Sequence, residues 1–378
     1  MRAILLLINR IFCYFDFHQK SKSALLNFCS VVFITISLAI TVSFVQQCFV
    51  RAEHKDLWND EIASLRNTCE RPESTFLYIF LNGSPGQVSP APLDYLLLKG
   101  FYEIREKVHS FGLSTNVYYR LNSIFSNVIS GFVIVMILFW HVRKNMTNFL
   151  VFVLQMVSLL LALGIYLYWP FNFLYSVEMR PYALWNSLWF SSLALFLLYK
   201  GFRKPMAVLF IVLAMTVTAS VYQLLSFILG FWIVKLLDRE KWSSIFKITL
   251  KYFTAPMALN AYYYLLRRIH YGYAPEYSYE FMHFWTHKEM IPILSVTGIL
   301  MTIFFKELRH HLIIFSTILI LYLMSPLINY ISMAHGYFFS SRHYIYFDLI
   351  YPIFLIHLTL SLPFYLEKIR EYCSQNKV

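Results

Sequence analysis

The chain has 378 residues, of which 58% are hydrophobic and 19% aromatic, while only 14% are charged. Soluble domains carry about 25% charged residues, so this composition excludes an ordinary soluble globular protein. The net charge is +12, but the basic residues lie in short segments between apolar runs, which argues against a nucleic-acid-binding protein. We therefore expect an all-α polytopic membrane protein.

Apolar runs near the length of a membrane-spanning helix, about 20 residues, recur along the chain. Ten spans are predicted, at 24–46, 122–140, 148–168, 182–199, 206–220, 221–237, 246–265, 290–305, 312–330 and 346–366. The segment 206–237 forms either two spans or one broken hairpin. Lys247 and Lys251 interrupt the run at 246–265, which makes that span the least regular of the set.

Lysine and arginine occupy alternate connections between these spans, and they also precede the first span and follow the last one. The positive-inside rule therefore predicts that these segments and both termini face the cytoplasm. The outward-facing connections are then 51–119, 169–181, 266–289 and 333–345. We expect the whole chain, 1–378, to be one transmembrane domain without a soluble C-terminal domain.

The first outer loop, 51–119, is the longest, and its second half has the pattern of an amphipathic helix. Its apolar residues recur at helical spacing, namely Leu93, Leu96, Leu97, Phe101, Ile104 and Val108. Charged residues, among them Asp94 and Lys99, stay largely off that face. Such a helix is expected to lie along the membrane surface rather than cross it.

Three arginines stand at the predicted outer starts of spans: Arg120, Arg180 and Arg342. The positive-inside rule and the helix dipole both disfavour a cation at this place. A bound anion resolves the conflict, because the free backbone N–H groups of a helix start and guanidinium groups together bind phosphate. The alternative is that each arginine pairs with a nearby acid, as Glu178 is close to Arg180 and Asp348 to Arg342 in sequence.

Two adjacent acids, Asp60 and Glu61, follow the first span on the same predicted side as these arginines. A carboxylate beside an anion site suits general-base catalysis on an acceptor hydroxyl, and an arginine stabilises charge on a departing phosphate. A lipid-linked phosphate is the donor that presents its headgroup at this depth. The alternative is an ordinary solvated loop, because a lone Asp-Glu pair is a weak motif.

Two histidines in an outer loop, His283 and His287, have the i, i+4 spacing that binds zinc on a helix. No third ligand is evident in the sequence. We therefore expect these side chains to line a groove or face solvent, with a divalent metal as the less favoured alternative. No other cofactor is indicated.

Four stretches of the chain resemble a known family. They are "NDE" after the first span, "PAPLDYLLLKGFYEI" followed by "FGLSTNVYYRLNSIFSNVISG", "YSVEMRPYAL", and "SRHYIYFDLIYP" before the last span. Together they resemble the GT-C membrane glycosyltransferases, in particular the bacterial relatives of protein O-mannosyltransferases and of the lipid A aminoarabinose transferase. The resemblance implies inverting transfer of a sugar from a polyprenyl-phosphate donor to a lipid, glycan or protein acceptor. It also implies a bacterial inner membrane with the site on the outer face.

The resemblance also assigns roles to particular residues. Asp60 corresponds to the catalytic aspartate of the family, and Glu61 to its acidic neighbour. The expected phosphate-binding residues are Arg120, Arg180, Tyr182 and Arg342, with Glu178 and His343 in support. The chain departs from the family in reading Arg-His-Tyr where Arg-Tyr is usual, and in being short.

Two other functions fit parts of the pattern. One is a polymerase or ligase that acts on a polyprenyl-diphosphate glycan, although such enzymes typically need no acid soon after the first span. The other is a lipid-sugar flippase without catalysis. Transporters tend to show internal repeats, broken helices and charges near the midplane. Here the charges gather at one face, so the glycosyltransferase is the favoured prediction.

Overall fold

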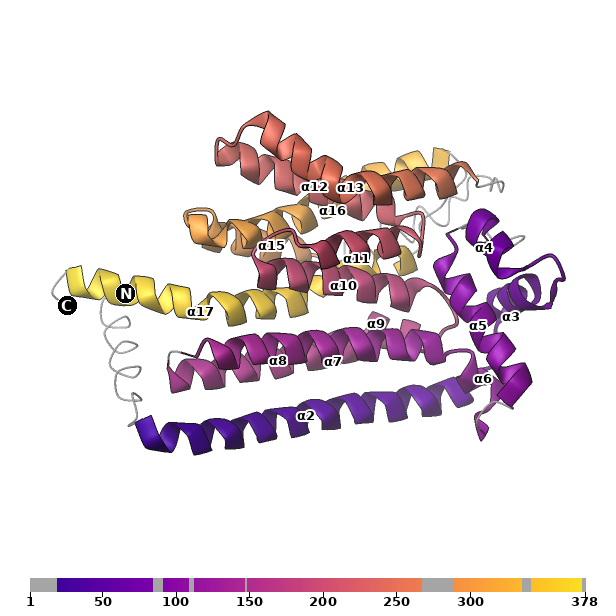
Figure 1. Cartoon of the computed structure of the whole chain (residues 1–378), viewed down its shortest axis with the longest axis horizontal. Helices are drawn as coiled ribbons and strands as arrows, with labels where there is room; N and C mark the ends of the chain where they lie inside the picture. Colours follow the sequence, from indigo (N-terminus) through magenta and orange to yellow (C-terminus); the bar gives the residue numbers. More distant parts are fainter. Residues whose placement is uncertain are drawn as a thin grey trace.

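The computed structural model describes residues 19–83, 91–108, 112–146, 148–266, 288–334 and 341–375. Within these ranges every regular element is helical (Figure 1). Seven helices are long and apolar enough to cross a membrane: α2 (Gln19–Glu53), α7 (Leu121–Lys144), α8 (Phe149–Tyr168), α10 (Tyr182–Tyr199), α12 (Ser220–Leu237), α16 (Arg309–Ala334) and α17 (Ile350–Gln375). They extend along the long axis of the molecule. The chain is thus an α-helical, multi-pass membrane protein.

The other three predicted spans also form helices, but none of them meets the same criteria. Helices α11 (Lys204–Ala214) and α15 (Met290–Thr302) are shorter than a bilayer requires. Helix α13 (Trp242–Leu265) is long enough, but Lys247 and Lys251 lower its apolar character. Length and composition therefore support seven of the ten predicted spans in the described chain, and the total number of crossings stays a prediction.

The segment 206–237 is interrupted rather than continuous. Helix α11 ends at Ala214, and turn bonds such as the one from the Ser220 N–H to the Val217 carbonyl, 3.0 Å long, connect it to α12. Helices α11 and α12 then pack against each other. This segment therefore forms a helical hairpin in which the first arm is too short to cross a bilayer unaided.

Short helices cover one end of the bundle, which we call the capped end (Figure 1). They are α3 (Asn59–Leu65), the π-helical turn η1 (Arg66–Glu70), α4 (Phe76–Asn82), α5 (Leu93–Val108) and α6 (Thr115–Tyr118). The described part of α2 begins at the opposite end, and α17 ends there. We call this second end the basic end, because its connections carry Lys200, Arg239, Lys241, Lys306 and Arg309.

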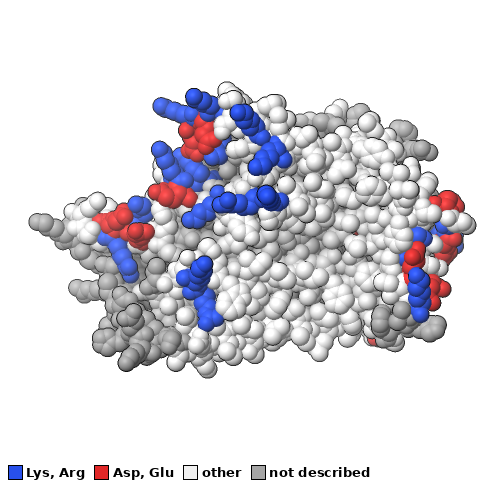
Figure 2. Space-filling view, viewed as in Figure 1, with Lys and Arg blue, Asp and Glu red and all other residues white. Residues whose placement is uncertain are grey.

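Charge is distributed unevenly along the bundle. On the face shown in Figure 2, lysine and arginine predominate at the basic end with acids among them, both signs are also mixed at the capped end, and a broad uncharged band lies between the two ends. Such a band suits a hydrocarbon environment, in which charged side chains are costly. The positive-inside rule predicts that the basic end faces the cytoplasm.

The predicted amphipathic helix is α5, but the face that it buries differs from the predicted apolar stripe. Asp94, Tyr95 and Leu98 are buried, whereas Ile104 from the stripe is 46% exposed. The N–H of Leu93 donates to the Met215 carbonyl oxygen at 2.9 Å, which fixes the first turn of α5 to the end of α11. The stripe is therefore left partly exposed, as a helix at a membrane surface requires.

A buried polar network connects α7, α8 and α10 to the short helix α9 (Pro170–Ser176). Asn127 Oδ1 accepts hydrogen bonds from the Tyr166 hydroxyl at 2.9 Å and the Ser187 hydroxyl at 2.8 Å. Asn127 Nδ2 donates to Ser176 Oγ at 2.6 Å, and Asn172 Nδ2 donates to the Tyr166 carbonyl at 2.5 Å. Unpaired polar groups are expensive in an apolar interior, so this network holds α9 in one position.

Candidate functional site

The Asn-Asp-Glu motif forms the first turn of α3, directly beyond the end of α2. Acidic residues stabilise a helix start, where backbone N–H groups lack partners. Glu61 Oε2 accepts the Trp58 N–H at 3.2 Å and so caps its own helix. The two acids differ in environment, because the side chain of Asp60 is 46% exposed and that of Glu61 is 0% exposed.

Glu61 forms a buried ion pair with Arg120, whose side chain is also 0% exposed. Arg120 Nη2 lies 2.7 Å from Glu61 Oε2, and Arg120 Nε lies 3.3 Å from Oε1. Arg120 also donates to the carbonyl oxygens of Ala52, Lys55 and Asp56, at and just beyond the end of α2. Carbonyls at a helix end have no partner within the helix. These contacts explain the arginine at this helix start without an anion.

The loop between α9 and α10 is fixed by three contacts. The N–H of Met179 donates to Glu61 Oε1 at 2.5 Å, and Ser123 Oγ donates to the Glu178 carbonyl at 2.6 Å. The carboxylate of Glu178 pairs with Lys55 at 2.8 Å rather than with Arg180. Because Asp60 precedes Glu61 and Arg180 follows Met179, the Glu61–Met179 bond brings Asp60 and Arg180 together.

Arg180 Nη2 lies 3.7 Å from Asp60 Oδ2, which is within ion-pair range but beyond hydrogen-bonding distance. The guanidinium carbon is 5.9 Å from the ring centres of both Trp58 and Tyr182. Its Nε is buried and has no hydrogen-bond acceptor among the described residues. Arg180 therefore retains donor capacity beside an exposed carboxylate, at the start of α10.

A third carboxyl group, Asp94, belongs to the same site and was not predicted from the sequence. It lies in the first turn of α5, is 6% exposed, and accepts a hydrogen bond from Asn122 Nδ2 at 3.0 Å. Burial raises the pKa of Asp94 to about 6, while the positive charge of Arg180 and the bond from Asn122 act in the opposite direction. The only signal for Asp94 in the sequence is its place in the first turn of a helix, and the amphipathic pattern assigned it to the polar face.

The remaining predicted residues are only partly described. Arg342 and His343 lie at the start of the 3₁₀ segment η4 (Ser341–Leu349), but their side chains are outside the described residues. Segment η4 packs against α10, with the rings of Trp185 and Tyr346 5.3 Å apart. An approach of Arg342 to Arg180 thus stays a prediction. The predicted pairing role of Asp348 is fulfilled by Lys288, and both side chains are buried.

His283 and His287, for which a metal was the less favoured alternative, lie outside the described residues. Among the residues that are described, no group of three His, Cys, Asp or Glu side chains is arranged to hold a metal ion. The candidate site is made of Asp60, Asp94 and Arg180, with Trp58 and Tyr182 beside them. No protein-family model, curated protein or solved structure matches the chain.

Proposed function

We propose that the chain is a glycosyltransferase that moves a sugar from a polyprenyl-phosphate donor to an acceptor hydroxyl at the capped end. The observation that carries the proposal is the pairing of an exposed carboxylate, Asp60, with a largely buried arginine, Arg180, at 3.7 Å. Displacement at an anomeric carbon requires a base for the acceptor and a cation for the leaving phosphate. The two side chains have these chemical properties. The resemblance of the four sequence stretches to GT-C glycosyltransferases supports the same assignment.

In the proposed reaction Asp60 takes the proton of the acceptor hydroxyl as its oxygen attacks the anomeric carbon. The bond between that carbon and the phosphate oxygen breaks, with inversion, and negative charge grows on the phosphate. Arg180 binds this charge, and Arg342 is proposed as a second cation in the same role. The products are the glycosylated acceptor and the polyprenyl phosphate, and Asp60 then releases its proton to solvent.

Glu61 and Arg120 have a different part in this proposal from the one that the motifs implied. Both are fully buried and bonded to each other, so we assign them to positioning. Glu61 holds α3 and the loop before α10 in register through Arg120 and the Met179 N–H. Glu178 supports the same loop through Lys55. Tyr182 places its ring beside Arg180.

We propose that the capped end faces outward from a bacterial inner membrane, with both termini in the cytoplasm. The excess of lysine and arginine at the opposite end supports this orientation (Figure 2). The donor then reaches the site from the bilayer, and the acceptor is a lipid, glycan or protein on the outer side. The separation of charge to the two ends, on the face shown, makes a flippase the weaker alternative.

The test uses cells that lack this gene and are complemented with variants. Mass spectrometry of the cell-envelope glycans and lipids should show a glycosylated species that disappears with the gene and returns with the wild-type chain. Asp60→Asn should leave transfer at least about 100-fold lower, because general-base catalysis contributes this much or more. Asp56→Asn is the matched control, since Asp56 is an exposed acid in the same loop.

If Asp60→Asn restored the glycosylated species to the wild-type level, Asp60 would not be the general base and the proposed mechanism would be wrong. A change in glycan chain length, without loss of a single sugar unit, would favour a polymerase or ligase instead. The measurement also names the sugar and the acceptor, because the missing mass identifies both.

A further inference from the structure

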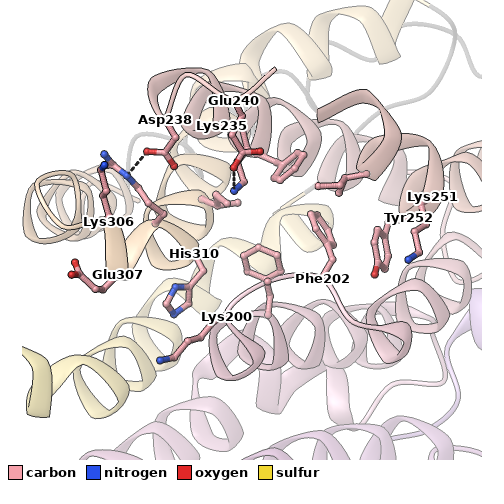
Figure 3. A pocket seen from close by; sticks show the side chains of 16 residues that line it. Lys200, Phe202, Lys235, Asp238, Glu240, Lys251, Tyr252, Lys306, Glu307 and His310 are labelled. Atoms are coloured by element: carbon pink, nitrogen blue, oxygen red, sulfur yellow. Dashed lines mark hydrogen bonds and ion pairs between the residues drawn. The ribbon is translucent and has the colours of Figure 1, made fainter. Parts of the chain in front are cut away.

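A cavity of about 720 Å³ lies at the basic end, opposite the capped end that carries the acid–arginine site. The side chains that line it are drawn in Figure 3. The cavity is bounded by the end of α10, the end of α12, the first half of α13, and the start of α16 with the 3₁₀ turn η3 (Lys306–Leu308) before it. Ligand pockets in proteins have volumes of about 300 to 1,000 Å³, so this space is large enough for a bound molecule.

The charged side chains around the cavity do not balance. Five lysine or arginine residues line it, against three acids. Two acids are engaged, since Lys235 lies 2.6 Å from Glu240 and Arg309 lies 2.7 Å from Asp238. Within the described chain no ion pair involves the remaining cations, Lys200, Lys251 and Lys306. In Figure 3 Asp238 and Glu240 lie along the upper rim, while Lys306, Lys200 and Lys251 lie at three separate edges of the cavity, with the aromatic rings between Lys200 and Lys251.

The rest of the lining is aromatic. Phe202 stacks on Tyr252 with ring centres 4.8 Å apart, and it meets Phe231 edge to face at 5.1 Å. Phe196 packs on Phe202 at 5.2 Å and completes this wall. The cavity thus combines an apolar wall with a cationic rim. Such a lining suits a ligand that is itself amphipathic and negatively charged.

The backbone at Lys200 determines where its side chain leaves the end of α10. Lys200 ends α10 with φ of 55°, in the left-handed region. Glycine adopts this conformation without strain, whereas other residues do so at a cost. The turn is closed by the Gly201 N–H, which donates to the Phe196 carbonyl at 3.1 Å. Arg239, which follows α12, has nearly the same φ of 56° but does not line the cavity, so the turn itself is a helix ending, and it is the position of Lys200 that places its side chain on the cavity.

We propose that this cavity binds the phosphate headgroup of an anionic phospholipid. Lys200, Lys251 and Lys306 surround the cavity and attract the negatively charged headgroup, and Phe202, the most exposed ring of the aromatic wall, contacts the glycerol backbone. The lining includes Lys200, Lys306 and Arg309 of the basic end, and headgroups lie at the ends of a bilayer-embedded bundle. Basic pockets between transmembrane helices bind anionic lipids in this way. The site does not depend on the glycosyltransferase assignment.

The experiment measures thermal unfolding of the full-length protein in a neutral detergent with added lipid. Phosphatidylglycerol should raise the midpoint in a saturable manner, and phosphatidylcholine at the same concentration should not, because binding to the folded state alone stabilises it. Lys251→Gln should weaken the apparent affinity for phosphatidylglycerol about fivefold, as expected for the loss of one cation near a lipid phosphate.

The matched control is Lys247→Gln. Lys247 lies one turn earlier on α13 and is exposed like Lys251, but it does not line the cavity. Lys200→Asn provides a second variant that keeps the turn, because asparagine tolerates the left-handed conformation. Its midpoint without lipid should match or exceed that of the wild type, while its affinity for phosphatidylglycerol falls.

Three results would overturn the proposal. The first is an equal response to phosphatidylglycerol and phosphatidylcholine. The second is an equal loss of affinity in Lys247→Gln and Lys251→Gln, which would indicate general surface charge rather than a site. The third is a full response to inorganic phosphate alone, which would assign the cavity to a soluble anion.

Discussion

The two ends of the bundle use the same charged residue types in opposite ways. At the capped end Glu61 and Arg120 are both 0% exposed and are matched by further hydrogen bonds. At the basic end the side chains of Lys235 and Glu240 are 24% and 34% exposed, and lysines are in excess. Buried, matched charges fix the positions of neighbouring groups, whereas solvated, unmatched charges remain able to bind a partner. The charges of the capped end thus hold neighbouring groups in position, and the excess lysines of the basic end are available to bind an anion.

The sharpest way to test this difference is to break one ion pair at each end. Arg120→Met should lower the free energy of unfolding by about 3 to 5 kcal/mol, because it leaves Glu61 buried without its cation. Lys235→Met should change it by no more than about 1 kcal/mol, as is typical of exposed pairs. Chemical unfolding in detergent gives both values. Equal losses from the two variants would contradict the comparison.

Asp94 offers a test within the capped end, because its charge is buried without a direct cation contact. Its folded pKa of about 6 lies above the ordinary aspartate pKa of 3.8. The folded state therefore disfavours the ionised form of Asp94. The stability that the neutral carboxyl contributes is fully present below about pH 4 and is lost as the pH rises through about 6. At 1.36 kcal/mol per pKa unit, the free energy of unfolding is lower at pH 7 than below pH 4 by about 3 kcal/mol from this group alone.

Asp94→Asn should remove this loss, so the variant gains stability over the wild type between pH 4 and pH 6.5. The measurement is the difference in unfolding midpoint between the two proteins across that range. A difference that stays constant with pH would show that Asp94 does not titrate there. Activity of the variant, measured in parallel, shows whether the same carboxyl also takes part in the reaction.

The smallest expected effect concerns Arg180. Arg180→Lys keeps the positive charge but loses the planar fork that binds two phosphate oxygens at once. We expect kcat/KM for the lipid donor to fall about tenfold, or about 1.4 kcal/mol. The control is Arg66→Lys, at an exposed arginine of the capped end, which should leave kcat/KM for the lipid donor unchanged. An unaltered kcat/KM in Arg180→Lys would contradict the proposal that Arg180 binds the donor phosphate.

Several features of the candidate site could be predicted because they depend on local sequence. The acids after the first span and the arginine before α10 are visible as charges at the edges of apolar runs. The proximity of Asp60 and Arg180 follows the prediction that they share one side of the membrane. The pairing of Arg120 with Glu61 could not be foreseen, since it joins residues 59 positions apart. Asp94 was missed because its burial depends on packing against α7 and α11, which no local pattern reveals.

By itself, the sequence determined that this protein is a bundle of membrane-crossing helices with its charges at the ends. The physical reason is that a hydrocarbon layer excludes charge and unpaired backbone groups, so long apolar runs must form helices. Only the tertiary structure decided which of two adjacent acids is buried and which is exposed. That outcome depends on where Met179 and Arg120 place their donors, and hydrogen bonds between distant segments are set by packing rather than by sequence spacing.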